Sequence, residues 1–112
     1  MTNNYRDVVE HVHRKALELS MVALSRSDDD LFAELKFRTK QGDTNIHLKL
    51  QSRLAEGTIG IWFDRKSMDI SVWEIREGES IYEFHNIITN WDDVNNHVDE
   101  AINAFLNPDL NQ

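Results

Sequence analysis

Residues 58–84 read TIGIWFDRKSMDISVWEIREGESIYEF and contain three short runs rich in β-branched and aromatic residues. The turn-forming segments Arg65–Ser67 and Glu77–Ser80 separate these runs. Runs of this kind, joined by only a few residues, are typical of consecutive antiparallel strands. We therefore expect strands over residues 58–64, 68–76 and 81–86, and we interpret the rest of the chain as what pairs with this sheet or covers it.

Two earlier segments, residues 31–40 and 44–53, alternate apolar and polar residues with the period of a half-buried strand. A turn is expected at Gln41–Asp43 and another at Ala55–Gly57, where the chain would enter the third strand. The apolar positions that should form one core face are Leu31, Ala33, Leu35, Phe37, Ile46, Leu48, Leu50, Ile59, Ile61 and Phe63.

The fourth strand has a less regular pattern than the others. Ile70 and Val72 suit one face of a sheet, whereas Trp73 and Ile75 suit the other. Either a β-bulge shifts the register in this strand or both of its faces are covered. The sequence leaves both alternatives open.

Helices are predicted over residues 5–24 and 91–106, where apolar residues recur at steps of three and four. Leu17, Met21 and Leu24 would widen the apolar stripe of the first helix, and residues 2–4 would cap it. The acidic segment Ser25–Asp30 reads as a solvated loop, and residues 109–112 as a loose end. The prediction is a single α+β domain over residues 1–112: a helix, a five-stranded antiparallel meander and a helix, with both helices packed on one face of the sheet.

Composition narrows the functional classes. The 112 residues include no cysteine, which excludes a disulfide, a thiolate nucleophile and a zinc–thiolate site. The amino-terminal residues do not resemble a secretory signal, and the apolar runs are too short to span a membrane, so we expect a cytoplasmic protein.

The net charge of −8 is unevenly placed. Residues 1–27 carry +1, residues 28–66 are neutral, and residues 67–112 carry −9 with Arg76 as their single base. Such a field repels nucleic acid and anionic lipid and attracts basic partners. The plainer interpretation is a solvated acidic surface that keeps the protein soluble.

An aromatic patch is the first candidate site. If the helices cover one face of the sheet, Phe32, Trp62, Trp73 and Ile75 should lie on the other, and Tyr82 or Phe84 would join them. Exposed apolar area of that size marks interaction sites, and tryptophan is a frequent anchor. The alternative is that sheet curvature, a bulge or a helix buries these side chains.

The second candidate is an acidic set that would pair with a basic partner and accelerate its association. It comprises Glu74, Glu77, Glu79, Glu83, Asp92, Asp93, Asp99 and Glu100. Together with Trp62, Trp73 and Ile75, the residues Glu74, Glu77, Glu79 and Glu83 are the predicted partner-binding residues.

Other chemistries have weak support in the sequence. The spacings Asp7/His11 and His97/Glu100 suit a pair of helical metal ligands but arise by chance in an acidic chain. We find no nucleophile turn, phosphate-binding loop or oxyanion device, so we expect no enzyme, no cofactor and no metal site. The basic residues of the first three strands are interleaved with acids, which argues against direct binding of nucleic acid.

The sequence therefore favours a small acidic protein that binds and neutralises a basic partner protein. An immunity protein, an antitoxin or a phage-encoded inhibitor would act in this way. Two alternatives remain: a homodimeric structural, adaptor or chaperone-like protein whose aromatic sheet face is its self-interface, and a sensor with a small-ligand pocket between the helices and the sheet.

Overall fold

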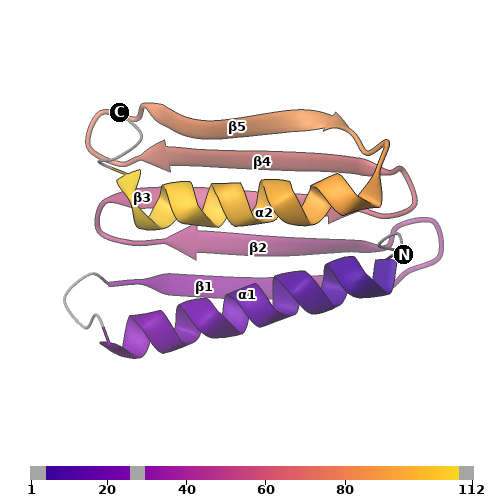
Figure 1. The fold of residues 1–112 in the computed structure, drawn as a ribbon, viewed down its shortest axis with the longest axis horizontal. Helices are drawn as coiled ribbons and strands as arrows, with labels where there is room; N and C mark the ends of the chain where they lie inside the picture. Colours follow the sequence, from indigo (N-terminus) through magenta and orange to yellow (C-terminus); the bar gives the residue numbers. More distant parts are fainter. Residues whose placement is uncertain (1–4, 26–29, 109–112) are drawn as a thin grey trace.

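The computed structural model describes residues 5–25 and 30–108, which form two helices and one five-stranded antiparallel sheet (Figure 1). The elements are α1 (Tyr5–Ser25), β1 (Phe32–Arg38), β2 (Asn45–Gln51), β3 (Ala55–Trp62), β4 (Ser67–Glu74), β5 (Ser80–Ile87) and α2 (Trp91–Leu106). Neighbouring strands follow chain order, so the predicted meander is confirmed. The predicted cap at residues 2–4, residues 26–29 of the predicted acidic loop and the tail 109–112 lie outside the described residues.

Both helices pack on the same face of the sheet, as predicted. Helix α1 lies over β1 at one edge, and α2 lies over the middle of the sheet (Figure 1). The core between these layers is formed by alternate residues of the strands and by the apolar stripes of the helices, including Val8, Val12, Val98 and Phe105. Burial of these side chains is the main stabilising term of the fold.

The predicted burial of alternate apolar residues is confirmed in β2 and β3. Ile46, Leu48 and Leu50 are fully buried, as are Ile59 and Ile61 on the next strand. The edge strand follows the pattern less well. Phe37 lies on the core side but is half exposed. Because β1 is an edge strand, Phe37 has a neighbouring strand on one side only.

The predicted turn at Ala55–Gly57 is wrong, because β3 already begins at Ala55. The turn lies three residues earlier, where the Ser52 hydroxyl accepts hydrogen bonds from the backbone N–H groups of Leu54 and Ala55. Gly57 belongs to β3 and lies close to the neighbouring strand β4. A Cβ at this position would lie 3.2 Å from the Ser71 carbonyl oxygen and from a methyl carbon of Val72.

A register shift between β4 and β5 occurs at Val72 and Trp73, so a bulge lies beside the fourth strand and not within it. Val72 pairs with Tyr82, but Trp73 pairs with Ser80, so β5 contains one extra residue at this point. Strand β4 then ends at Glu74, two residues earlier than predicted.

The boundaries of α2 follow from its caps. The Asn90 side chain accepts the Asp92 N–H, and Asn107 donates its backbone N–H to the Asn103 carbonyl at the other end. The expected widening of the α1 stripe is wrong, because Leu17, Met21 and Leu24 are exposed, Leu24 by 87%. Within residues 5–25 and 30–108, neither helix is long and apolar enough to cross a membrane.

Candidate partner-binding surface

Most of the predicted partner-binding residues lie at one end of the sheet. Trp73 and Glu74 end β4, and Ile75, Glu77 and Glu79 form the connection to β5. The turn between β2 and β3 lies beside them, because the Ile75 N–H donates to the Leu54 carbonyl at 3.0 Å. We call this region the end surface: residues 52–54 of the β2–β3 turn, residues 73–79, and residues 105–108 at the end of α2.

Hydrogen bonds hold the β4–β5 connection in one shape. The Glu74 N–H donates to the Glu79 carbonyl at 2.8 Å, and the Glu74 carboxylate accepts the Glu77 N–H, also at 2.8 Å. Gly78 adopts φ of +71°, a left-handed conformation that glycine reaches without a steric penalty. The exposed carboxylates of Glu77 and Glu79 are therefore presented by a defined loop.

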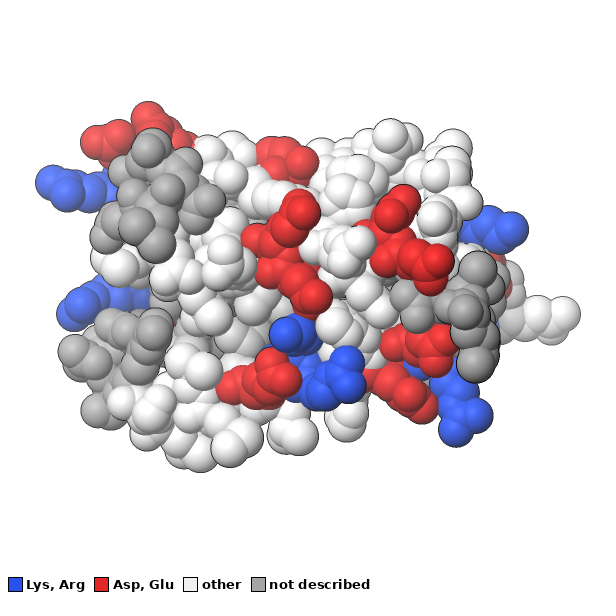
Figure 2. Space-filling view, in the orientation of Figure 1, with Lys and Arg blue, Asp and Glu red and all other residues white. Residues whose placement is uncertain are grey.

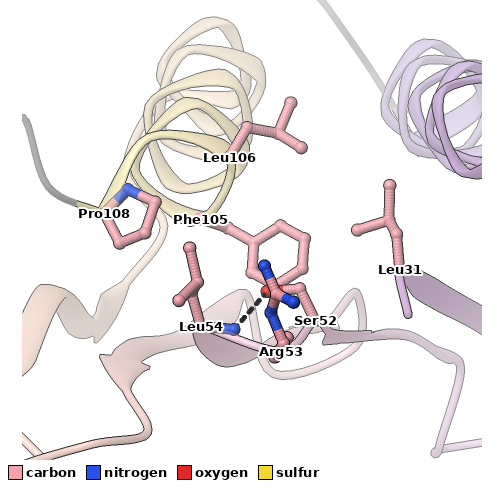
Figure 3. Close-up of a pocket in the computed structure, with 7 residues that line it drawn as sticks. All are labelled: Leu31, Ser52, Arg53, Leu54, Phe105, Leu106 and Pro108. Carbon is pink, nitrogen blue, oxygen red and sulfur yellow. Dashed lines mark hydrogen bonds between the residues drawn. The ribbon is translucent and has the colours of Figure 1, made fainter. Parts of the chain in front are cut away.

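Two adjoining hollows mark the end surface. The smaller one, of about 70 Å³, lies under the end of α2. Figure 3 shows the Phe105 ring at its centre, with Leu54 and Pro108 on one side and Leu31 on the other. The larger and more open one, of about 380 Å³, shares Arg53, Leu54 and Pro108 with it and extends along residues 74–77.

The end surface combines apolar area with a small excess of negative charge, because its three glutamates outnumber its two arginines by one. Leu54 is 50% exposed and Ile75 is 43% exposed, and both line the larger hollow. Helix α2 directs its carboxyl end here and has no basic residue in its last turn, so its dipole adds negative potential. The side chains of Arg53 and Arg76 are the basic groups among the lining residues. This composition suits a partner that offers an apolar side chain beside basic ones.

Trp62 is not part of this surface. Its neighbour on β4 is Ser67, whereas Trp73 pairs with Glu56, so the two tryptophans lie at opposite ends of the same two strands. The Trp62 indole lies across Gly60, where an added Cβ would be 2.8 Å from a ring carbon. The His47 ring meets it edge-on at 4.9 Å, and the Arg65 guanidinium lies over it, also at 4.9 Å. Trp62 is thus partly buried by its own surroundings.

Glu83 lies halfway along the edge strand β5, on the uncovered face of the sheet, in a cluster with Asp69, Ser71, Ser80 and His85. Its carboxylate accepts the Ser71 hydroxyl at 2.9 Å and contacts His85 Nε2 at 2.5 Å, while His85 Nδ1 lies 3.1 Å from Asp69. Hydrogen bonds with Glu83 first, and then with Asp69, raise the pKa of His85 above 6.5. Desolvation opposes ionisation of Glu83, but hydrogen bonds from His85 and Ser71 outweigh it and lower the pKa of this carboxyl.

This cluster superficially resembles a serine–histidine–aspartate arrangement. Ser71 Oγ lies 3.4 Å from His85 Nε2. However, the Ser71 hydroxyl donates its hydrogen bond to Glu83 and not to the histidine. His85 Nε2, which would have to accept the serine proton, is itself hydrogen-bonded to Glu83. The geometry therefore orders the sheet surface and does not activate Ser71.

The expectation that Tyr82 or Phe84 would join an exposed aromatic face is wrong, because both lie on the helix-covered side. The Tyr82 hydroxyl lies 2.8 Å from His97 Nδ1 and donates to Glu100 at 3.0 Å. Burial and then the Glu100 carboxylate raise the pKa of Tyr82. The Phe84 ring lies 3.9 Å from the His97 ring. The extra residue at the bulge reverses the face to which odd- and even-numbered residues of β5 point. The sequence of the strand alone did not show where this reversal occurs.

The acidic set is dispersed over the molecule. Asp92 and Asp93 lie in the first turn of α2, at the opposite end from Glu77. Asp99 contacts α1, where it lies 2.6 Å from His11 and 3.8 Å from Lys15. Figure 2 views the helix-covered face and shows carboxylates in separate groups, with basic side chains between some of them.

The two spacings considered for metal ligands, Asp7/His11 and His97/Glu100, lie on α1 and α2. Across residues 5–25 and 30–108, no group of three or more histidine or carboxylate side chains is placed to hold a metal ion. His11 contacts Asp99 of the other helix, and His97 contacts Tyr82 as well as Phe84.

Sequence reasoning missed several surface residues. Leu54 and Pro108 of the end surface carry no local signal, because only the packing of α2 brings their segments together. Phe32, which was predicted on the uncovered face, is partly exposed in the same row of residues as Trp73, with two strands between them. The chain matches no protein-family model, no curated protein and no solved structure.

Proposed function

We propose that this protein binds a basic partner protein through the end surface and neutralises it, in the manner of an immunity protein, an antitoxin or a phage-encoded inhibitor. The supporting observation is the coincidence, at one end of the sheet, of the exposed side chains Leu54 and Ile75 with a loop that carries Glu74, Glu77 and Glu79. An apolar centre with a charged rim is the usual composition of a protein interface.

Each part of the surface has a separate role in this proposal. Leu54 and Ile75 are the contacts that lose water when the partner binds, and they supply affinity. Glu77 and Glu79 stand at the rim, where charge chiefly raises the association rate and makes it sensitive to salt. Trp73 lies beside them at the end of β4, whereas Trp62 is too far along β3 to belong to the same contact. Glu83 lies closer, since it accepts the Ser80 hydroxyl at the start of β5.

The proposal places the protein in the cytoplasm and assigns it binding without catalysis. The absence of cysteine fits a reducing compartment. A ligand-sensing role has less support: small-molecule pockets usually measure about 300–1,000 Å³ and are largely enclosed. The hollows that reach this size, of about 380 and 430 Å³, are open and have charged linings, and the hollow under the end of α2 holds only about 70 Å³.

The test is capture of a partner from a lysate of the native host by the pure protein, at low and at high salt, with variants of the end surface. We expect a basic protein that binds stoichiometrically at low salt, is lost at high salt, and is not retained by Leu54→Asp. The double variant Glu77→Lys/Glu79→Lys should slow its association by about tenfold or more at low salt.

Matched control variants make the same chemical changes elsewhere. Leu17→Asp alters an exposed leucine of α1, and Glu10→Lys/Glu18→Lys reverses two exposed charges on that helix. Both controls should capture the partner as the unchanged protein does. If the end-surface variants and the controls capture it equally well, the end surface is not the binding site. If no basic partner is captured at either salt concentration, the proposed function is wrong.

A further inference from the structure

Strand β5 is an open edge of the sheet. Sheet order places β1 and β5 at the two edges, and no helix lies in front of β5 in Figure 1. Backbone N–H and C=O groups along such an edge can pair with another strand, so proteins usually shield or interrupt it. Among the described residues, β5 has neither proline nor lysine to do so, and its bulge lies at Ile81 near the start of the strand, so residues 82–87 form a regular edge.

The ladder with β4 fixes which groups of β5 point outward. Ile88 donates its N–H to the Lys66 carbonyl, so the even-numbered residues of β5 exchange hydrogen bonds with β4. Glu83, His85 and Ile87 therefore direct their backbone groups toward the free edge. In agreement, the Ile87 N–H is accepted by the Asn86 side chain and by no residue of β4.

The sequence of this edge is nearly symmetric about Phe84. Read outward from Phe84, the residues of segment 81–87 pair as Glu83 with His85, Tyr82 with Asn86, and Ile81 with Ile87. A two-fold axis through Phe84 would place Glu83 of one chain opposite His85 of the other, twice. Ile81 is the extra residue of the bulge and packs against the core, so the two Glu83–His85 pairs carry the complementarity. Opposite charges directly across a ladder are stabilising.

Neighbouring registers lack this complementarity. An axis through Glu83 sets two carboxylates opposite each other, and an axis through His85 sets histidine against histidine and Glu83 against Ile87. Like charges directly opposite across a ladder destabilise it. The side chains of β5 thus select one register for self-pairing.

The helices decide which edge can pair. Strand β1 has similar symmetry about Leu35, with Glu34 on one side and Lys36 on the other. However, α1 lies over β1, so joining two β1 edges would place two α1 axes about 5 Å apart, closer than the 8–10 Å that packed helices require. Helix α2 lies over the middle of the sheet, and two copies joined at β5 keep several strand spacings between their α2 helices.

We propose that two copies of this chain associate through antiparallel pairing of β5 with β5, with Phe84 next to the two-fold axis, to form one continuous ten-stranded sheet. All four helices then lie on the same face, and the two end surfaces point in opposite directions. The contact is short, so association is reversible and weaker than that of a typical obligate dimer. This inference stands independently of the proposed function, because β5 pairing leaves the end surface free.

Sedimentation velocity over a range of protein concentrations tests the association. We expect a monomer–dimer equilibrium that Glu83→Lys weakens by about tenfold or more, since it sets two cationic groups opposite each other. His85→Glu should weaken it similarly. The double variant E83K/H85E restores opposite charges across the axis and should recover most of the association. Glu10→Lys, with the same change in net charge on α1, should have no effect.

Amide hydrogen exchange followed by NMR identifies the edge directly. As the concentration rises, protection should increase at the outward amides of Glu83 and His85. The outward amides of β1, including Leu35, should be unaffected. A protein that stays monomeric at about millimolar concentration, protection that increases at β1 instead of β5, or a double variant as weak as the single ones would each overturn the proposal.

Discussion

The contact between Gly60 and Trp62 predicts that Gly60→Ala destabilises the protein only while the Trp62 indole is present. In Gly60→Ala the new Cβ would lie 2.8 and 2.9 Å from two ring carbons of Trp62, well inside van der Waals contact. The indole therefore has to swing away from the sheet. It would then lose its edge contact with His47 and its stacking under Arg65, both at 4.9 Å.

The magnitude follows from these contacts. An aromatic pair contributes about 0.5–1.5 kcal/mol and an exposed cation–π contact about 0.5–1 kcal/mol. Replacing a strand glycine by alanine stabilises the folded state by about 0.5–1 kcal/mol, because the unfolded chain loses conformational freedom. Gly60→Ala should therefore destabilise the protein by about 1 kcal/mol, which lowers its melting temperature by roughly 4 °C or more.

The assay is a double-mutant cycle by urea denaturation, with Gly60→Ala measured in the natural sequence and in Trp62→Ala. Without the indole the nearest neighbour of the new methyl group is the His47 ring, at 3.2 Å, which is exposed and can move. The substitution should then become neutral or stabilising, giving a coupling free energy of about 1–2 kcal/mol. The same destabilisation in both backgrounds would refute the claim that Trp62 is held by the space above Gly60.

Three further predictions concern the core, the polar cluster and a helix cap. Leu48→Ala removes a fully buried side chain and should cost about 2–5 kcal/mol in chemical denaturation; a loss below about 1 kcal/mol would contradict its central position. His85 should titrate above pH 6.5 by NMR, because Glu83 and then Asp69 favour its charged form. A raised pKa means that this stabilisation is complete below pH 6.5 and is lost as the pH rises through the folded value, and Glu83→Gln should lower the pKa; an unchanged titration would refute the pairing. Asn90→Ala removes the side-chain cap of α2 and should cost about 1 kcal/mol, whereas Asn90→Ser should cost less; equal losses would exclude capping as the cause.

Errors in the sequence-based prediction have identifiable physical reasons. Ala55–Gly57 reads as a turn because glycine and a charged residue stand together, but Gly57 is needed where β3 passes close to Val72 on β4. Leu17, Met21 and Leu24 have helical spacing, but the sheet offers no apolar surface on their side of α1. Both errors concern what lies on the neighbouring element, and a local pattern does not contain that information.

Some parts of the candidate site were also predictable from the sequence, whereas others depend on how the elements pack. Residues 73–79 lie together because they are consecutive in the chain, so their proximity was predictable. Strand parity correctly placed Trp62 and Trp73 on the same face, but pairing with β4 separates them by most of a strand length. The contributions of Leu54 and Pro108 depend on α2 ending above the β2–β3 turn, which no local pattern indicates.

The sequence by itself determined the order of helices and strands, the meander and the buried face, because these depend on side-chain periodicity and on connections too short for any other pairing. The near-symmetry of segment 81–87 is also visible in the sequence. Only the tertiary structure decided that β5 is the open edge while α1 covers β1, and that three separate segments form the end surface. Such features depend on how helices pack across a sheet, which is set by the shape of the whole core.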